Sequence, residues 1–307
     1  MAAGIALLRR RDQVIRQIRA YFQQDGFLEV ETPQLSPYAC AESHIELFTV
    51  DSGEADTRYL LASPEWYMKR LLAEGSGSLF QIGKVFRRGE SGRLHNPEFT
   101  LLEWYRETRQ LTAVMDDCIA LLAMVVPEVR VEQWDYRDLF KQHFGADLWC
   151  IGDRELAELA AEHGLHGSSD SDTCTDFLFD RMVCAVDSET AWVVKHFPPS
   201  KASYAELTPD GQYALRFELF FRGIELANGY SELRDGAVVL ERHERVNQER
   251  RRQHKSAYPF DKQAATVLTS LPPCAGAAMG IDRLIMLASA SRRITDVLGF
   301  HFQPRVN

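Results

Sequence analysis

The stretch FRRGESGRLHNPEFTLLEWY, residues 86–105, determines which fold this chain is expected to adopt. Two segments with apolar residues at strand-like spacing flank a polar, arginine-rich loop. Arg87 precedes the loop and Phe99 follows it, while Glu103 and Tyr105 lie two residues apart and should point to one face of the second strand. An arginine, an aromatic ring and a carboxylate in this order could bind a phosphate, a purine and an ammonium group. The alternative is a surface hairpin with ordinary charges.

The composition is that of an ordinary globular protein. The 307 residues are enough for one large domain or two of ordinary size, and a hydrophobic content of 45% with 26% charged residues can supply a full core. The net charge of −9 argues against a protein that coats nucleic acid, although it leaves room for a local basic patch.

Nothing in the sequence indicates export, a membrane span or a disulfide framework. The six cysteines contain no CxxC pair, so reduced thiols are expected rather than zinc ligands or disulfides. No apolar run reaches membrane-spanning length, and the N-terminus lacks a signal-peptide pattern. We therefore expect a cytoplasmic protein.

Hydrophobic periodicity and turn residues predict helices and strands on both sides of the hairpin. Helices are expected over residues 5–24, 64–72, 111–126, 153–163, 239–255 and 280–290, and strands over 27–33, 59–62, 191–196 and 214–221. The polar stretch SSDSDTCTD, residues 168–176, is expected to be a loop, and the Gly/Ala-rich segment before residue 280 a turn. Strands near both ends predict an α+β fold with one antiparallel sheet flanked by helices.

Three further segments carry groups suited to ligand binding. Ser63-Pro64-Glu65 opens a helix whose exposed N–H groups and carboxylate could orient a zwitterion, although SPE is also a capping signal. In residues 217–235, Glu218 and Glu225 flank a possible strand reversal and could meet to bind a divalent metal; a salt-bridged core strand is the alternative. Asn228 and Glu232 follow, and a buried glutamate needs a cationic partner.

The third segment, GAAMGIDRL (276–284), places small residues before a helix with Arg283 in its first turn. Small residues let a ligand approach the backbone, and an arginine at a helix start is electrostatically unfavourable unless it serves an anion.

Together these segments resemble the motifs of class II aminoacyl-tRNA synthetases. FLEVETP (27–33), the hairpin (86–105) and GIDR (280–283) resemble motifs 1, 2 and 3, and HNPEF (95–99), SPE with MKRLL (63–72) and NGYSEL (228–233) resemble the lysyl branch. The resemblance covers about residues 10–110 and 212–300, whereas 127–205 is less recognisable. It implies one class II synthetase-like catalytic domain over 1–307, and motif 1 implies a homodimer.

A lysyl-tRNA synthetase carries an anticodon-binding barrel before motif 1, and this chain begins at the motif 1 helix, so we expect no such domain and no tRNA binding. In this respect it is similar to the elongation factor P–(R)-β-lysine ligases, which place β-lysine on a lysine of elongation factor P. Ala278 stands where lysyl-tRNA synthetases have a pocket-floor glycine. Its methyl, at roughly 1–3 kcal/mol in a tight pocket, could disfavour an α-amino group and leave room for a β-amino group.

The resemblance implies adenylation of a lysine-like carboxylate, with ATP and Mg²⁺ as cofactors. Arg87 would bridge that carboxylate and the α-phosphate, and Arg283 would hold the terminal phosphate, so these two are the implied catalytic residues. ATP contacts are implied for Arg87, Arg88, Gly89, Asn96, Phe99 (stacked on adenine), Glu225, Leu226, Gly280 and Arg283, and Mg²⁺ binding for Glu218 and Glu225. Gly89 departs from the Arg-x-Glu of motif 2, so the usual glutamate contact would pass to Glu90 or to backbone groups.

The same resemblance assigns the amino-acid pocket. Ser63 and Glu65 would bind the α- or β-amino group, and Tyr105 and Glu232, supported by Glu103, the distal ε-ammonium; Asn228 would bind the carboxylate, and Ala278 would form the floor. Two other functions stay open. One is tRNA charging or free-standing amino-acid activation by a lysyl- or asparagine-type enzyme, and the other is a regulatory paralogue that binds ligand without turnover.

Overall fold

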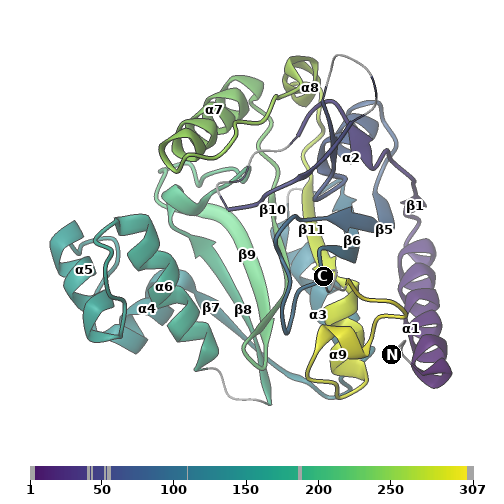
Figure 1. Ribbon diagram of the computed structural model, residues 1–307, viewed down its shortest axis with the longest axis horizontal. Helices are drawn as coiled ribbons and strands as arrows, with labels where there is room; N and C mark the ends of the chain where they lie inside the picture. Colours follow the sequence, from purple (N-terminus) through teal and green to yellow (C-terminus); the bar gives the residue numbers. More distant parts are fainter. Residues whose placement is uncertain are drawn as a thin grey trace. The chain divides into compact units, whose positions relative to one another are not determined.

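The computed structural model describes residues 4–39, 42, 44–51, 53, 57–108, 110–185 and 189–302. The chain divides into two compact units, one formed by Met1–Pro127 with Ser231–Asn307 and the other by Glu128–Tyr230. The predicted single catalytic domain over the whole chain stays a prediction. Figure 1 labels the elements of both units.

The first unit is built on a sheet in which strands far apart in the sequence are neighbours. In order of pairing, the strands are β1 (Leu28–Glu29), β5 (Leu79–Phe86), β6 (Glu98–Arg106) and β11 (Ala275–Gly280). The β5–β6 and β6–β11 pairs are antiparallel, and β1–β5 is parallel. A small antiparallel sheet contains β2 (Leu35–Ser36), β4 (Arg58–Leu60) and β3 (Phe48–Val50). The helices are α1 (Ile5–Gln24), α2 (Glu65–Ala73), α3 (Leu111–Ala123), α7 (Gly236–Arg252), α8 (Lys262–Leu268), α9 (Ile281–Ala288) and the 3₁₀ turn η2 (Ile294–Asp296).

Side-chain alternation on β6 separates the core of this unit from its functional face. Trp104 lies opposite Phe80, and both are fully buried. Phe22 of α1 stacks on Phe80 with ring centroids 5.0 Å apart, and Asp117 of α3 accepts a hydrogen bond from Trp104 Nε1. Helices α1 and α3 therefore cover the face of the even-numbered residues, and the odd-numbered residues of β6 point to the opposite face.

The second unit is built from four further strands and from helices of its own. In order of pairing, its strands are β10 (Ile224–Ser231), β9 (Ala214–Phe221), β8 (Thr190–Phe197) and β7 (Arg130–Asp135), antiparallel except for β7–β8. Its helices are α4 (Tyr136–Phe144), α5 (Asp153–Glu162), α6 (Ser171–Cys184) and the 3₁₀ turn η1 (Pro199–Lys201). Aromatic residues of the helices and strands, such as Tyr136, Phe197 and Phe220, share one core. The predicted class, α+β with an antiparallel sheet flanked by helices, is confirmed.

Two predictions of secondary structure are wrong. The expected loop 168–176 instead runs into α6, which Asp170 caps by accepting a hydrogen bond from the backbone N of Thr173 at 2.8 Å. Cys174, Leu178 and Met182 are buried at four-residue spacing on this helix, so its apolar stripe was present among the polar residues. The expected Gly/Ala-rich turn is strand β11, because pairing with β6 overrides the low strand propensity of small residues.

No helix within the ranges described above is long and apolar enough to cross a membrane. Five of the six cysteines have free thiols, namely Cys118, Cys150, Cys174, Cys184 and Cys274, while Cys40 lies outside the described residues.

Candidate active site

Three carboxylates are buried together in the first unit. Glu65 opens α2, Glu103 lies on the functional face of β6, and Glu232 directly follows β10. Ser63 Oγ donates to Glu103 Oε2 at 2.8 Å and accepts from the backbone N of Glu65 at 3.0 Å. Tyr105 donates its hydroxyl to Glu103 Oε1 at 2.6 Å. The structure thus brings together the five residues predicted to bind the amino groups of a substrate.

Lys69 is a member of this cluster that the sequence did not reveal. Its Nζ lies 2.6 Å from Glu65 Oε1 and also forms an ion pair with Glu232, and the residue is only 1% exposed. The sequence signal was the i,i+4 spacing of Glu65 and Lys69 at the start of α2. That spacing does not distinguish a buried pair from a solvated one.

The three carboxylates are buried and repel one another, so a cation bound between them is favourable. Burial, together with the charge of Glu65, raises the pKa of Glu103 to about 7, although hydrogen bonds from Tyr105 and Ser63 oppose the shift. Burial also raises the pKa of Glu232, and Lys69 opposes this. Burial alone would lower the pKa of Lys69, but the charges of Glu232 and Glu65 raise it above its usual value. Lys69 therefore stays charged, and a bound ammonium group would favour the ionised form of each carboxylate.

Strand β11 lies beside this cluster of buried carboxylates. Ala278 lies opposite Glu103 and Gly276 opposite Tyr105, so all four residues face the same side of the sheet. A Cβ on Gly276 would meet the Tyr105 ring at 2.4 Å and Glu232 Oε1 at 3.1 Å. The tyrosine can therefore lie across β11 only because residue 276 has no side chain. The methyl of Ala278 is placed beside Glu103, and its effect on specificity stays a prediction.

Gly276→Ala should damage the pocket much more than Gly280→Ala. A Cβ on Gly276 overlaps the Tyr105 ring, whereas a Cβ on Gly280 would touch Arg283 only at an ordinary 3.7 Å. We expect Gly276→Ala to lower the free energy of unfolding in urea by roughly 1–3 kcal/mol and Gly280→Ala by less than about 0.5 kcal/mol. Equal stability of the two variants would contradict the placement of Tyr105 across β11.

The predicted motif 2 hairpin contains an arginine–aromatic pair at the base of its loop. The Arg87 guanidinium lies over the ring of Phe99, 5.1 Å from its centroid. Gly89 has φ +85°, in the left-handed region that favours glycine, and Glu90 Oε1 lies 3.8 Å from Arg87 Nη1. The positive φ of Gly89 explains why a glycine stands at this position of motif 2. The carboxylate of Glu90 lies near Arg87.

The hairpin loop is joined to α9 through a residue that had no predicted role. Arg283 Nη2 donates to His95 Nε2 at 2.7 Å, which places the two predicted phosphate-binding segments side by side. Asn96 is occupied within the chain, since its Nδ2 donates to the carbonyl of Glu98 and its Oδ1 accepts from the backbone N of Phe302 at 2.9 Å. Its nucleotide contact stays a prediction.

Arg88 also has contacts within the chain. Its backbone N donates to the carbonyl of Glu46 at 2.6 Å, and its guanidinium lies 3.7 Å from the Glu46 carboxylate. Its nucleotide contact is likewise a prediction.

Glu218, Glu225 and Asn228 lie on one face of the β9–β10 hairpin in the second unit. Glu225 and Asn228 are three residues apart, which on a regular strand would place them on opposite faces. A register shift between Glu225 and Ala227 brings them to the same face. Asn228 Nδ2 therefore comes within 3.5 Å of Glu225 Oε1 and lies opposite Glu218 in the register. Leu226 lies within the shift with a buried side chain, so only its backbone could contact ATP.

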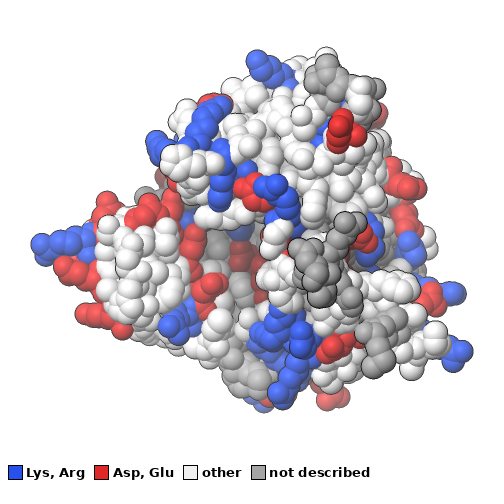
Figure 2. Space-filling model, in the orientation of Figure 1, with Lys and Arg blue, Asp and Glu red and all other residues white. Residues whose placement is uncertain are grey.

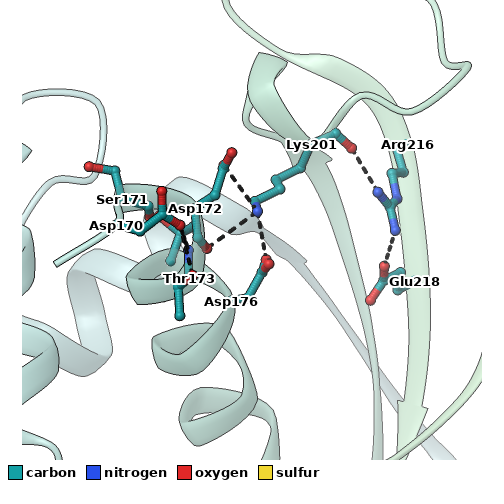
Figure 3. Close-up of polar contacts among 9 residues, drawn as sticks. Asp170, Ser171, Asp172, Thr173, Asp176, Lys201, Arg216 and Glu218 are labelled. Atoms are coloured by element: carbon teal, nitrogen blue, oxygen red, sulfur yellow. Dashed lines mark hydrogen bonds and ion pairs between the residues drawn. The ribbon is translucent and has the colours of Figure 1, made fainter. Parts of the chain in front are cut away.

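The predicted metal pair, Glu218 and Glu225, has an acidic environment in which Arg216 is a cationic neighbour. Figure 3 shows Arg216 between the carbonyl of Lys201, which accepts its hydrogen bond at 2.7 Å, and the carboxylate of Glu218. Burial raises the pKa of Glu218 to about 7; Arg216 opposes the shift, and Glu225 and Asp176 add to it.

In the described part of the chain, no three or more His, Cys, Asp or Glu side chains are arranged as a metal site. Two carboxylates suit Mg²⁺ that is shared with substrate phosphates, because this ion is usually bound by one or two carboxylates and the phosphates rather than by an all-protein cage. Glu218 and Glu225 fit that kind of binding.

The basic residues at the end of α7 are largely paired. Figure 2 shows Arg side chains along this helix, and three of its arginines form ion pairs with glutamates of the same helix: Arg245–Glu241, Arg251–Glu244 and Arg252–Glu249. A fourth, Arg250, is fully buried and bonds Glu46 at 2.9 Å. These pairs favour a solvated surface and a structural anchor rather than a binding patch.

Comparisons with known proteins identify the family of this chain. Residues 4–303 match the family model described as tRNA synthetases class II (D, K and N). The elongation factor P–(R)-β-lysine ligase of Haemophilus ducreyi is 39% identical over 308 residues, which covers 97% of this chain and 94% of the relative. The proteins of the same name from Yersinia enterocolitica and Yersinia pestis are 39% identical over 311 residues, which covers 97% of this chain and 96% of each relative. The protein therefore belongs to the family of class II tRNA synthetases of the D, K and N group.

Proposed function

We propose that this protein uses ATP to activate (R)-β-lysine as an adenylate and then transfers it to a lysine side chain of elongation factor P. The observation that carries the proposal is the buried cluster of Glu65, Glu103 and Glu232, which lies in the same unit as the Arg87–Phe99 pair. Such a cluster suits an amino acid with more than one ammonium group. The names of the 39% identical relatives supply the substrate and the acceptor.

Activation requires positioning more than acid–base chemistry. The substrate carboxylate is ionised at pH 7 and attacks the α-phosphate in line with the departing pyrophosphate. Arg87 neutralises charge between the two reactants, and Arg283, oriented by His95, holds the terminal phosphate. Asn228 binds the substrate carboxylate. Glu218 and Glu225, together with the phosphates, would hold Mg²⁺, which would offset the charge of ATP.

The second step transfers the acyl group from AMP to an amine. The acceptor lysine attacks the carbonyl carbon, AMP leaves, and the nitrogen loses a proton. Because a free lysine has a pKa of about 10.4, this amine must be deprotonated before or during attack.

We also propose a cytoplasmic homodimer. Large apolar side chains of α1, of motif 1 and of the residues that follow it are exposed on the isolated chain, including Ile5 (67%), Leu28 (51%), Leu35 (44%) and Tyr38 (42%). A dimer would cover such a surface. Light scattering that gives the mass of one chain at micromolar concentration would contradict this proposal.

ATP–pyrophosphate exchange with (R)-β-lysine and with α-lysine tests the activation step. We expect exchange with both amino acids and a higher kcat/KM for (R)-β-lysine. An absence of exchange with either amino acid would refute the proposal in favour of a ligand-binding paralogue without turnover.

Ala278→Gly should shift the preference toward α-lysine. Removal of the methyl beside Glu103 reopens the space for an α-amino group, so we expect the ratio of kcat/KM for β- over α-lysine to fall by about 10- to 100-fold. Ala277→Gly is the matched control, because Ala277 lies opposite Trp104 on the core face of the same strand. An unchanged ratio in Ala278→Gly would refute the role given to this methyl.

A further inference from the structure

The charges in the buried pocket do not balance. Lys69 faces Glu65 and the ring of Trp66 on its own helix, with its Nζ 5.3 Å from the ring centroid, and it faces Glu232 after β10. The charge of Lys69 also lowers the pKa of Glu103 on β6. The carboxylate of Glu103 accepts hydrogen bonds from the neutral side chains of Ser63 and Tyr105. Cys274 lies next to this group. Burial raises the pKa of its thiol, Glu107 adds to this shift and Arg234 opposes it. With all three glutamates ionised, the pocket holds two negative charges in excess.

We propose that Lys69 is a positioning residue that sets this excess: it forms ion pairs with Glu65 and Glu232 and leaves the three glutamates and the lysine with a net charge of −2, which matches an amino acid that carries two ammonium groups. The inference deepens the proposed function and rests on it, because it presumes that the pocket binds a diamino acid. Lys69 acts through the carboxylates and is not required to touch the substrate.

The stability of the fold alone does not explain why a lysine is buried at position 69. A buried ion pair usually contributes little to stability compared with apolar residues of similar volume, since desolvation of the charges offsets their attraction. Without Lys69, three carboxylates would share one buried site and at least one would become protonated. A protonated carboxylic acid cannot form an ion pair with an ammonium group, so the pocket would lose part of its affinity for a diamino acid at neutral pH.

The direction of the pH effect follows from these contacts. Glu103 and Glu232 must be ionised to bind ammonium groups, so kcat/KM for the amino acid falls as the pH drops through the raised pKa values of these two residues in the free enzyme. Lys69 lowers the pKa of Glu103 and Glu232, and Glu65 raises both. Removal of Lys69 should therefore move this acidic limb to higher pH, and removal of the charge on Glu65 should move it to lower pH.

The experiment compares kcat/KM for (R)-β-lysine in ATP–pyrophosphate exchange between about pH 5.5 and pH 8.5. We expect the acidic limb to rise by at least about one pH unit in Lys69→Met and to fall in Glu65→Gln, with the KM for ATP changed less than about threefold in both. Lys84→Met removes a lysine that is 42% exposed and pairs with Glu98, and it should leave the limb in place. A lysine that only supports the fold would not produce shifts of opposite direction.

An unchanged limb in a folded Lys69→Met variant, with the wild type active, would overturn this inference and leave the proposed function intact. If Lys69→Met does not fold, the inference is tested by the acidic limb of Glu65→Gln. A limb at lower pH than in the wild type supports the inference, and a limb at the same or a higher pH overturns it. A wild-type enzyme without exchange for either α-lysine or (R)-β-lysine would instead refute the proposed function, and this inference with it.

Discussion

Arg87→Ala should lower the rate of (R)-β-lysine-dependent ATP–pyrophosphate exchange by about 10³-fold. The reaction joins a carboxylate to a phosphate, so both reactants are anionic and the negative charge must be neutralised where they meet. Arg87 lies at the base of the motif 2 loop with its guanidinium over Phe99, and its Nη1 is 3.8 Å from Oε1 of Glu90. Among the described residues, the carboxylate near the guanidinium is therefore not a tight bidentate partner that would compete with the substrates.

Steady-state exchange kinetics at saturating ATP and amino acid measure this effect. The expected pattern is a large fall in kcat with smaller changes in both KM values, because the arginine acts mainly on charge in the transition state. Arg93→Ala is the matched control: Arg93 belongs to the same loop and donates a long hydrogen bond of 3.4 Å to the carbonyl of Arg292. A fall of less than about tenfold in Arg87→Ala, or an equal fall in both variants, would contradict the role of Arg87.

Glu232→Gln should raise the KM for (R)-β-lysine by about 10²- to 10³-fold and change the KM for ATP by less than about threefold. Loss of one buried charge opposite an ammonium group typically costs about 2–5 kcal/mol, since the remaining cation is left without its partner. Glu232 is 1% exposed, so water cannot replace the lost carboxylate. Lys69 still has Glu65 at 2.6 Å in this variant, which favours retention of the fold.

The control for this variant is Glu98→Gln, an isosteric change at a glutamate whose side chain is 54% exposed. We expect the KM for (R)-β-lysine to stay within about twofold of the wild-type value, because exposed ion pairs contribute little. Thermal unfolding should be compared for both variants. A well-folded Glu232→Gln enzyme with an unchanged KM for the amino acid would place the ammonium group elsewhere.

Local patterns predicted the hairpin that organises the first unit. The period-two alternation of residues 98–106 placed Glu103 and Tyr105 on one face, and their hydroxyl–carboxylate bond of 2.6 Å confirms it. The reversal between Glu218 and Glu225 was predictable in the same way, because Arg222 and Gly223 interrupt two apolar runs. The bulge that brings Asn228 to the same face was not predictable, since it depends on the pairing of β9 with β10.

The missed features depend on partners that are distant in the sequence. His95 and Arg283 are 188 residues apart, and Lys69 meets Glu232 only when α2 and the end of β10 come together. The Gly/Ala-rich run is a strand because β6 pairs with it, and its own residues have little strand propensity. Helix α6 differs, because its buried four-residue spacing was visible but was outweighed by the number of polar residues around it.

The acceptor experiment tests the central proposal most directly. The enzyme, ATP, Mg²⁺ and labelled (R)-β-lysine are incubated with elongation factor P and bulk tRNA in one mixture, and the label in each acceptor is measured after separation, with the modified residue identified by mass spectrometry. We predict that the label enters elongation factor P on a single lysine side chain and that tRNA stays unlabelled. Label in tRNA and none in elongation factor P would contradict the proposal.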